Sequence, residues 1–227
     1  MTMVRRLLLL VLSAALTCVA VAPLEEDASR SFRLWKRDFV HEAKQFTEIT
    51  QVDFKNWTYS SEGILEYPEG GPVRIQPLTL TDGKYSWRGP EGFGFEDASL
   101  ASVEYFSDES LSSPIAIVNL SYVYGGGSSN CVGVVQFFQI KDARVVLLYE
   151  ITYDCHGRSW FEFHQDKKEL EVGSVGYMHA DAHCCPSKID VGRFSLAAGA
   201  LRLISWERID YDENAGPGKQ RREKPKE

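Results

Sequence analysis

Positive charge is scarce in this 227-residue sequence. Its 25 lysine and arginine residues are outnumbered by 32 aspartate and glutamate residues, which gives a formal net charge of −7 at pH 7. Proteins that bind nucleic acid carry a basic patch or stripe, because contacts to phosphates supply much of the affinity. The composition therefore argues against nucleic acid as a partner.

A long apolar run is also missing. The longest one, Leu7–Val19, is shorter than the ~18 residues that suggest a membrane-spanning helix. Arg5 and Arg6 precede it and small residues follow it, which is the pattern of a cleaved secretory signal peptide. We expect cleavage after Ala20 rather than lipidation of Cys18, and no transmembrane segment in the mature chain. The expected location is the periplasm or the extracellular medium.

The rest of the chain shows no internal repeat and no alternation of strands with helices. Short runs rich in Val, Ile, Phe, Tyr and Trp instead alternate with turn residues, as in antiparallel β structure. We predict a signal peptide over 1–20, a linker over 21–30, one mainly β domain over 31–210 and a disordered charged tail over 211–227. The domain is expected to be a disulfide-stabilised antiparallel sheet or sandwich. The runs that we interpret as strands are Phe54–Tyr59, Val73–Leu78, Gly83–Trp87, Ala101–Phe106, Ile115–Tyr124, Val132–Ile140, Val145–Tyr153, Trp160–Gln165, Glu169–Val175, Ser187–Leu196 and Ala200–Arg208.

One segment departs from this pattern. Phe32, Trp35, Phe39 and Phe46 lie near helical spacing, with charged residues between them. Apolar residues spaced in this way line one face of an amphipathic helix. We therefore predict one short N-terminal helix within Ser31–Thr47, lying on the sheet.

Cysteine is scarce as well, with five in the chain. Cys18 leaves with the leader, and four thiols permit three pairings. A hairpin that turns at Lys141–Arg144 places Cys131 nearly opposite Cys155. A bridge there would close a loop of about 25 residues and stabilise the fold by roughly 3 kcal/mol if it acts through chain entropy. The partners that remain are Cys184 and Cys185, whose adjacent bridge would be strained; crossed pairings are the alternative.

Two motifs carry a resemblance to known sequences. The segments Asp53-Phe-Lys-Asn-Trp-Thr-Tyr59 and Ala182-His-Cys-Cys-Pro-Ser187 are similar to the opening and closing motifs of a family of uncharacterised bacterial secreted proteins. The similarity spans about Val52–Ile209. It implies an exported β domain, and it also favours the adjacent Cys184–Cys185 pair.

The same resemblance raises the question of calcium. Relatives often carry an aspartate- and glycine-rich loop before the strand that begins here at Ile115. In this chain the loop reads Ser107-Asp-Glu-Ser-Leu-Ser-Ser-Pro114 and lacks alternating carboxylates. Calcium loops depend on such carboxylates and on a turn glycine, so we expect no calcium site.

The densest group of potential ligands is His179-Ala-Asp-Ala-His-Cys-Cys185. Imidazole, carboxylate and thiolate groups bind zinc or copper, and a cysteine beside a histidine can also act as a nucleophile. Oxidised cysteines would lose both capacities, and Pro186 indicates a loop. We therefore interpret His179, Asp181 and His183 as loop residues rather than metal ligands. No catalytic or cofactor-binding residue is identified, and no cofactor is expected.

Aromatic residues gather around the turn Arg88–Gly92, namely Tyr85, Trp87, Phe93 and Phe95. They suit a sugar- or peptide-binding rim, but such residues more often close the end of a β core, which we favour. The sequence thus indicates an exported, non-catalytic β module that binds an envelope protein or glycan or has a structural role. A metal-binding or thiol-redox protein using the 179–185 loop and a hydrolase with an unrecognised site are the alternatives.

Processing of the leader can be tested directly. We expect N-terminal sequencing of the exported protein to begin at Val21, because Cys18 and Ala20 supply the small residues that signal peptidases require at positions −3 and −1. An intact leader in the membrane fraction, or a lipid on Cys18, would contradict this prediction.

Overall fold

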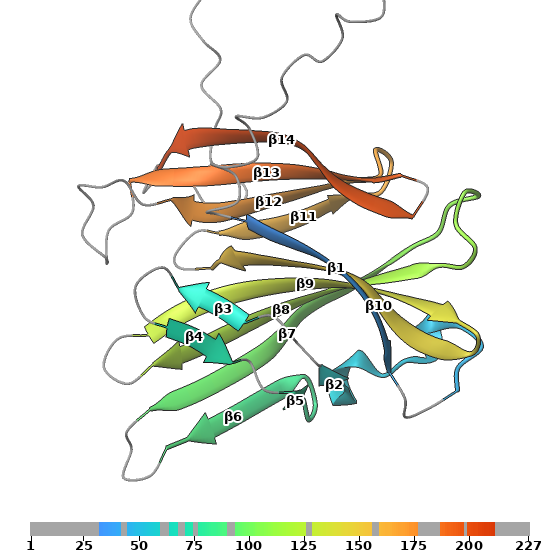
Figure 1. Ribbon diagram of the computed structural model, residues 1–227, viewed down its shortest axis with the longest axis horizontal. Coiled ribbons are helices and arrows are strands. Elements are labelled where there is room, and N and C mark those ends of the chain that lie inside the picture. Colours follow the sequence, from blue (N-terminus) through green and yellow to red (C-terminus); the bar gives the residue numbers. More distant parts are fainter. Residues whose placement is uncertain are drawn as a thin grey trace, which may run out of the picture.

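The computed structural model describes residues 32–41, 45–59, 64–67, 71–74, 77–89, 94–125, 129–155, 159–176, 187–197 and 199–211. The predicted signal peptide and linker, and the predicted tail beyond Tyr211, lie outside these residues. The described part is mainly β, and every strand pairing in it is antiparallel (Figure 1).

A six-stranded sheet has the order β1-β10-β9-β8-β7-β6. Its strands are β1 (Phe32–His41), β6 (Lys84–Arg88), β7 (Phe95–Phe106), β8 (Ile115–Gly125), β9 (Ser129–Lys141) and β10 (Arg144–Asp154).

A four-stranded sheet has the order β11-β12-β13-β14. Its strands are β11 (Trp160–His164), β12 (Glu169–Gly176), β13 (Lys188–Ala197) and β14 (Ala200–Asp210). Two small pairs and two 3₁₀ helices complete the fold: β2 (Thr58–Tyr59) with β5 (Leu78–Thr79), β3 (Ile64–Tyr67) with β4 (Gly71–Arg74), η1 (Ile49–Gln51) and η2 (Phe54–Asn56).

The two large sheets share one apolar cluster. Phe32 of β1 meets Phe194 of β13 with ring centroids 6.0 Å apart, and Phe106 of β7 meets Phe163 of β11 at 5.4 Å. Phe137 in β9 is fully buried and belongs to the same cluster. Both sheets therefore bury their facing side chains against each other, as the alternation of the predicted strands requires.

A second cluster covers the opposite face of the six-stranded sheet. The segment Asp53–Tyr59 supplies much of it, and the Phe54 ring lies 5.3 Å from the Phe138 ring of β9. The Asp53 carboxylate accepts a hydrogen bond from Nδ2 of Asn56 at 2.8 Å, which holds the short η2 turn. In this chain the opening motif is therefore a packing element for the sheet.

Most of the predicted strands from Gly83 onward are found, with ends that shift by a few residues. The Lys141–Arg144 hairpin is confirmed: Lys141 pairs with Arg144, and Asp142 and Ala143 have φ values of 50° and 59°. Positive φ at both central residues is the signature of the two-residue turn that matches strand twist. The strand predicted over Phe54–Tyr59 is only partly right, because η2 occupies its first half and only Thr58–Tyr59 form a strand.

The predicted helix within Ser31–Thr47 is wrong. Residues Phe32–His41 form β1, which pairs with β10 and so satisfies backbone groups along that strand. A bulge between Lys36 and Phe39 interrupts the alternation, and an extra residue in a strand makes aromatic spacing imitate a helical period. Phe46 lies beyond the strand and contacts Trp57 instead. Within the described ranges no helix is long and apolar enough to cross a membrane.

A buried carboxylate lies on the face that the second cluster covers. Glu150 of β10 is completely buried, and its two oxygens accept hydrogen bonds from Arg37 of β1 at 2.9 Å and from Gln136 of β9 at 2.6 Å. The Arg37 guanidinium also lies 4.9 Å from the Trp35 ring. Because an unpaired buried charge is costly, these contacts fasten the edge strand β1 to the sheet interior.

This arrangement predicts an asymmetric response to mutation. Arg37→Met is expected to lower the free energy of unfolding by about 3–5 kcal/mol, because Glu150 is left buried without its counter-ion. The double variant Arg37→Met/Glu150→Met should recover much of the loss. Urea unfolding of the mature protein with its disulfides intact measures both changes.

The control is Arg88→Met, which breaks the exposed ion pair with Asp97, whose side chains are 58% and 40% exposed. A much smaller change is expected there, since exposed pairs contribute little. Equal losses for Arg37→Met and the double variant would contradict the role assigned to Glu150.

Candidate functional site

The ligand-rich loop of the sequence lies outside the described residues. This holds for His179, Asp181, His183, Cys184 and Cys185, so the adjacent disulfide stays a prediction. Within the described ranges, no group of three or more His, Cys, Asp or Glu side chains is placed to hold a metal ion.

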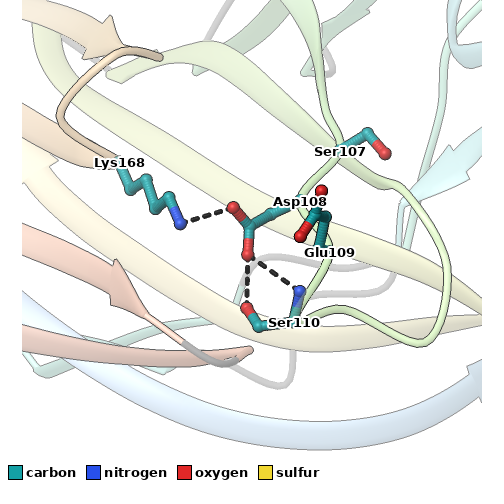
Figure 2. A pocket seen from close by; sticks show the side chains of 5 residues that line it. All are labelled: Ser107, Asp108, Glu109, Ser110 and Lys168. Atoms are coloured by element: carbon teal, nitrogen blue, oxygen red, sulfur yellow. Dashed lines mark hydrogen bonds and ion pairs between the residues drawn. The ribbon is translucent and has the colours of Figure 1, made fainter.

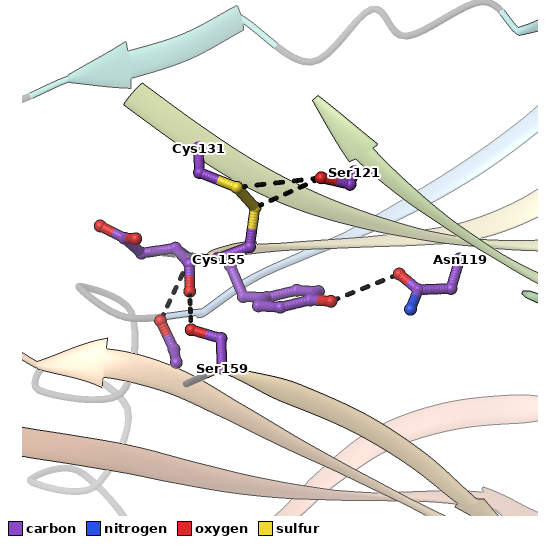
Figure 3. The surroundings of a disulfide bond; sticks show 8 residues. Asn119, Ser121, Cys131, Cys155 and Ser159 are labelled. Atoms are coloured by element: carbon purple, nitrogen blue, oxygen red, sulfur yellow. Dashed lines mark hydrogen bonds between the residues drawn. A yellow bond between two sulfur atoms is a disulfide. The ribbon is translucent and has the colours of Figure 1, made fainter. Parts of the chain in front are cut away.

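The described part does contain the hairpin disulfide. Cys131 is joined to Cys155 with their Cα atoms 5.1 Å apart, as the hairpin spacing predicts (Figure 3). The Ser121 hydroxyl of β8 lies 3.9 Å from each sulfur atom. Cys155 directly follows β10 and precedes the connection to β11. The bridge therefore anchors the chain at the point where it leaves the six-stranded sheet for the four-stranded one.

Hydrogen bonds around Asp154 reinforce the same crossing. Its backbone N–H donates to the Ser174 hydroxyl of β12 at 3.1 Å, and its carbonyl accepts from the Ser159 hydroxyl at 2.6 Å (Figure 3). Ser174 is fully buried, so its hydroxyl needs a partner, and the backbone of the crossing supplies one. The disulfide and these hydrogen bonds together fix the position of the two sheets relative to each other at the crossing.

Tyr153 fills the space between the sheets next to the disulfide. Its ring lies across Gly133 of β9, where an added Cβ would overlap the ring atoms. Its hydroxyl donates to Oδ1 of Asn119 at 3.3 Å, and burial raises the pKa of Tyr153 to about 12. Tyr153 therefore stays protonated and neutral at physiological pH, which suits a packing role better than proton transfer.

An open hollow of about 650 Å³ lies beside the 107–114 loop, lined by Ser107, Asp108, Glu109, Ser110 and Lys168 (Figure 2). Lys168, from the turn between β11 and β12, forms an ion pair with Asp108, and Ser110 donates to the same carboxylate. The contacts with Lys168 and then Ser110 hold the pKa of Asp108 well below its usual range. The Asp108 carboxylate, which a bound metal cation would need as a ligand, is therefore already paired with the Lys168 ammonium group.

Strand β11 presents its alternate residues to solvent. Trp160 and His164 are half-buried, and Glu162 between them is exposed. His164 lies 3.8 Å from Glu162, and Trp160 Nε1 donates to Glu171 of β12 at 3.3 Å. The face is a network of polar pairs rather than a cavity.

Sequence reasoning missed the buried ion pairs. Besides Glu150, Asp190 of β13 is fully buried and accepts from Arg208 of β14 at 2.6 and 2.9 Å. The signal was present, since both acids interrupt apolar runs that are predicted to be strands. A charge inside such a run indicates a buried partner, but only the strand register identifies it.

Comparison with known proteins does not extend these observations: no family model, no curated protein and no solved structure matches the chain. The resemblance to bacterial secreted proteins therefore stays a hypothesis. The described residues define a mainly β protein with antiparallel sheets and a disulfide at the junction between its two large sheets.

The disulfide predicts a measurable contribution to stability. Replacing Cys131 and Cys155 together by serine is expected to lower the free energy of unfolding by about 3 kcal/mol, because the unfolded chain regains the entropy of the opened loop. Urea unfolding measures the loss, and peptide mapping without reductant identifies the partners. A peptide that joins Cys131 to Cys184 would contradict the pairing.

Proposed function

We propose that the mature chain is an exported, non-catalytic β-sandwich module that works in the cell envelope by binding an envelope protein or glycan. The observation that carries the proposal is the Cys131–Cys155 bridge at the crossing between the sheets. Disulfides persist in oxidising compartments such as the periplasm and are rare in the cytosol. This supports export independently of the leader sequence.

The state of the acidic groups supports binding over catalysis. Asp108 is paired with Lys168, Glu150 with Arg37, and Asp190 with Arg208. A general acid or base must exchange a proton with a substrate, and carboxylates held in ion pairs are poorly suited to this. They suit a rigid framework, which lowers the entropy lost when a surface binds a partner.

The metal-binding or thiol-redox alternative depends on residues 179–185, which lie outside the described part of the chain, and the hydrolase alternative has no recognised site. Neither a metal or thiol-redox role nor a hydrolase activity gains a specific observation from the described residues. The binding module is therefore the function that these residues support best.

The proposal predicts saturable capture in the native envelope. Mature protein carrying a photoreactive residue at Tyr105, which is 41% exposed, should form a discrete adduct in intact envelopes. Excess unlabelled mature protein should abolish the adduct, because a specific surface is limited in number. Absence of any competed adduct, or turnover of a peptide, ester or glycan that is lost in folded Cys184 or His183 variants, would overturn the proposal.

A further inference from the structure

Four aromatic side chains surround one carboxylate on β6, β7 and β8. In one cross-strand row Trp87 is opposite Glu96, which is opposite Tyr124. In the next row Ala98 replaces the acid between its two aromatic neighbours. We refer to these six residues as the aromatic array: Tyr85, Trp87, Glu96, Ala98, Tyr122 and Tyr124.

The register gives the aromatic array a defined shape. Directly opposed residues have Cβ atoms about 5 Å apart, so the outer strands place aromatic rings on both sides of Glu96 and Ala98. The Tyr122 and Tyr124 rings stack with centroids 5.4 Å apart on the β8 side. On the β6 side Trp87 is 44% exposed, and its ring edge passes close to Gly94, whose φ is +81°. The array thus has an exposed aromatic face beside a half-buried acid.

Two phenol groups of β8 border the carboxylate. The hydroxyl oxygen of Tyr124 is buried and has no hydrogen-bond partner among the described residues, whereas the buried Tyr122 hydroxyl lies close enough to Glu96 to interact with its carboxylate. Burial raises the pKa of Tyr85 and of Tyr122, and the nearby Glu96 carboxylate raises both further. Glu96 therefore creates a negative potential among the phenol rings.

Arg88, the residue after Trp87 in β6, forms its ion pair with another acid. Alternation along β6 directs Arg88 to the opposite face, where its two terminal nitrogens bind Asp97 at 2.8 and 3.0 Å. Ser86 donates to the same carboxylate at 2.7 Å. Among the described residues no lysine or arginine forms an ion pair with Glu96, which leaves its charge available to a ligand. This face also differs from the hollow beside the 107–114 loop, where Lys168 already forms an ion pair with Asp108.

We propose that the aromatic array binds the ammonium group of a lysine side chain on a basic segment of a partner protein. Glu96 serves as the counter-ion, and the exposed Trp87 ring supplies the cation–π contact. Aromatic rings around an acid are the chemistry by which proteins recognise alkylammonium groups. The inference rests on the proposed binding function and selects a basic protein segment over a glycan as its ligand.

Titration of the mature protein with an acetylated tri-lysine amide tests the inference. Isothermal titration calorimetry measures the affinity of every variant, and the NMR signal of the Trp87 indole N–H reports the contact in those that keep Trp87. The wild type should bind this peptide in low salt and lose affinity as salt rises, because the contact is charge-dependent. The same peptide with Nε-acetylated lysines should not bind. Equal binding of the two peptides, or binding of a methyl glycoside without binding of the cationic peptide, would overturn the inference.

Variants locate the contact. Glu96→Gln should weaken tri-lysine binding at least about fivefold, and Trp87→Ala about two- to fivefold, as expected for one charge and one cation–π partner. The matched control Glu162→Gln removes an exposed acid of β11, 56% exposed, and should leave affinity unchanged. Urea midpoints equal to wild type confirm that each variant is folded. Equal affinity of the wild type and folded Glu96→Gln for the peptide would contradict the role of Glu96 as the counter-ion.

The same variants separate this inference from the proposed function. If Glu96→Gln lowers the competed envelope adduct in proportion to its loss of peptide affinity, both statements hold. If the adduct persists undiminished in Glu96→Gln, the module still binds a partner, but the aromatic array is not the contact. Loss of all competed capture in the wild type would instead reject the binding function itself.

Discussion

The rest of the structure depends on the burial of the β9–β10 hairpin on both faces. Its side chains alternate between the cluster shared by the two large sheets and the cluster covered by the Asp53–Tyr59 segment. A strand that is apolar on both faces cannot lie at a surface, so other elements must cover it on either side. The hairpin turn fixes the register, and that register brings Cys131 opposite Cys155 and Gln136 opposite Glu150. The geometry of the turn thus determines which residues form the disulfide and which form the buried Gln136–Glu150 hydrogen bond.

The strands of this hairpin could be predicted because their sequence signal is local. Alternation, β-branched residues and a two-residue turn all indicate the same structure between Val132 and Tyr153. Residues 32–41 could not be placed in this way, since a bulge inside β1 changes the side-chain period and only pairing with β10 decides its conformation. The strand prediction over Phe54–Tyr59 was only partly right for a related reason. Its aromatic residues resemble a strand, but an aspartate cap holds a 3₁₀ turn there.

The disulfide and the aromatic array also differ in whether local sequence predicts them. The Cys131–Cys155 bridge follows from counting outward from a turn, so the sequence alone was sufficient. The aromatic array spans three strands, and two of them are joined by the 107–114 loop, whose length does not fix the register. The sequence grouped Tyr85 and Trp87 with Phe95, but strand alternation directs Phe95 to the opposite face, where it lies 5.6 Å from the Arg88 guanidinium. What replaces it beside Trp87 is Glu96, a residue with no distinguishing local pattern.

The acids of this chain thus occupy two kinds of environment. Glu150 and Asp190 lie in the interior, where desolvation makes a counter-ion obligatory, and each has an arginine within hydrogen-bonding distance. Glu96 lies at a half-buried position next to exposed indole and buried phenol groups, and among the described residues no arginine forms an ion pair with it. Partial burial strengthens the attraction of a carboxylate for a cation, while partial exposure keeps the uncompensated charge tolerable in the unbound protein. A carboxylate in that intermediate environment can stay charged without a ligand and still gains free energy when it binds a cation. A fully buried acid cannot stay unpaired at so low a cost, and a fully solvated acid gains less from binding.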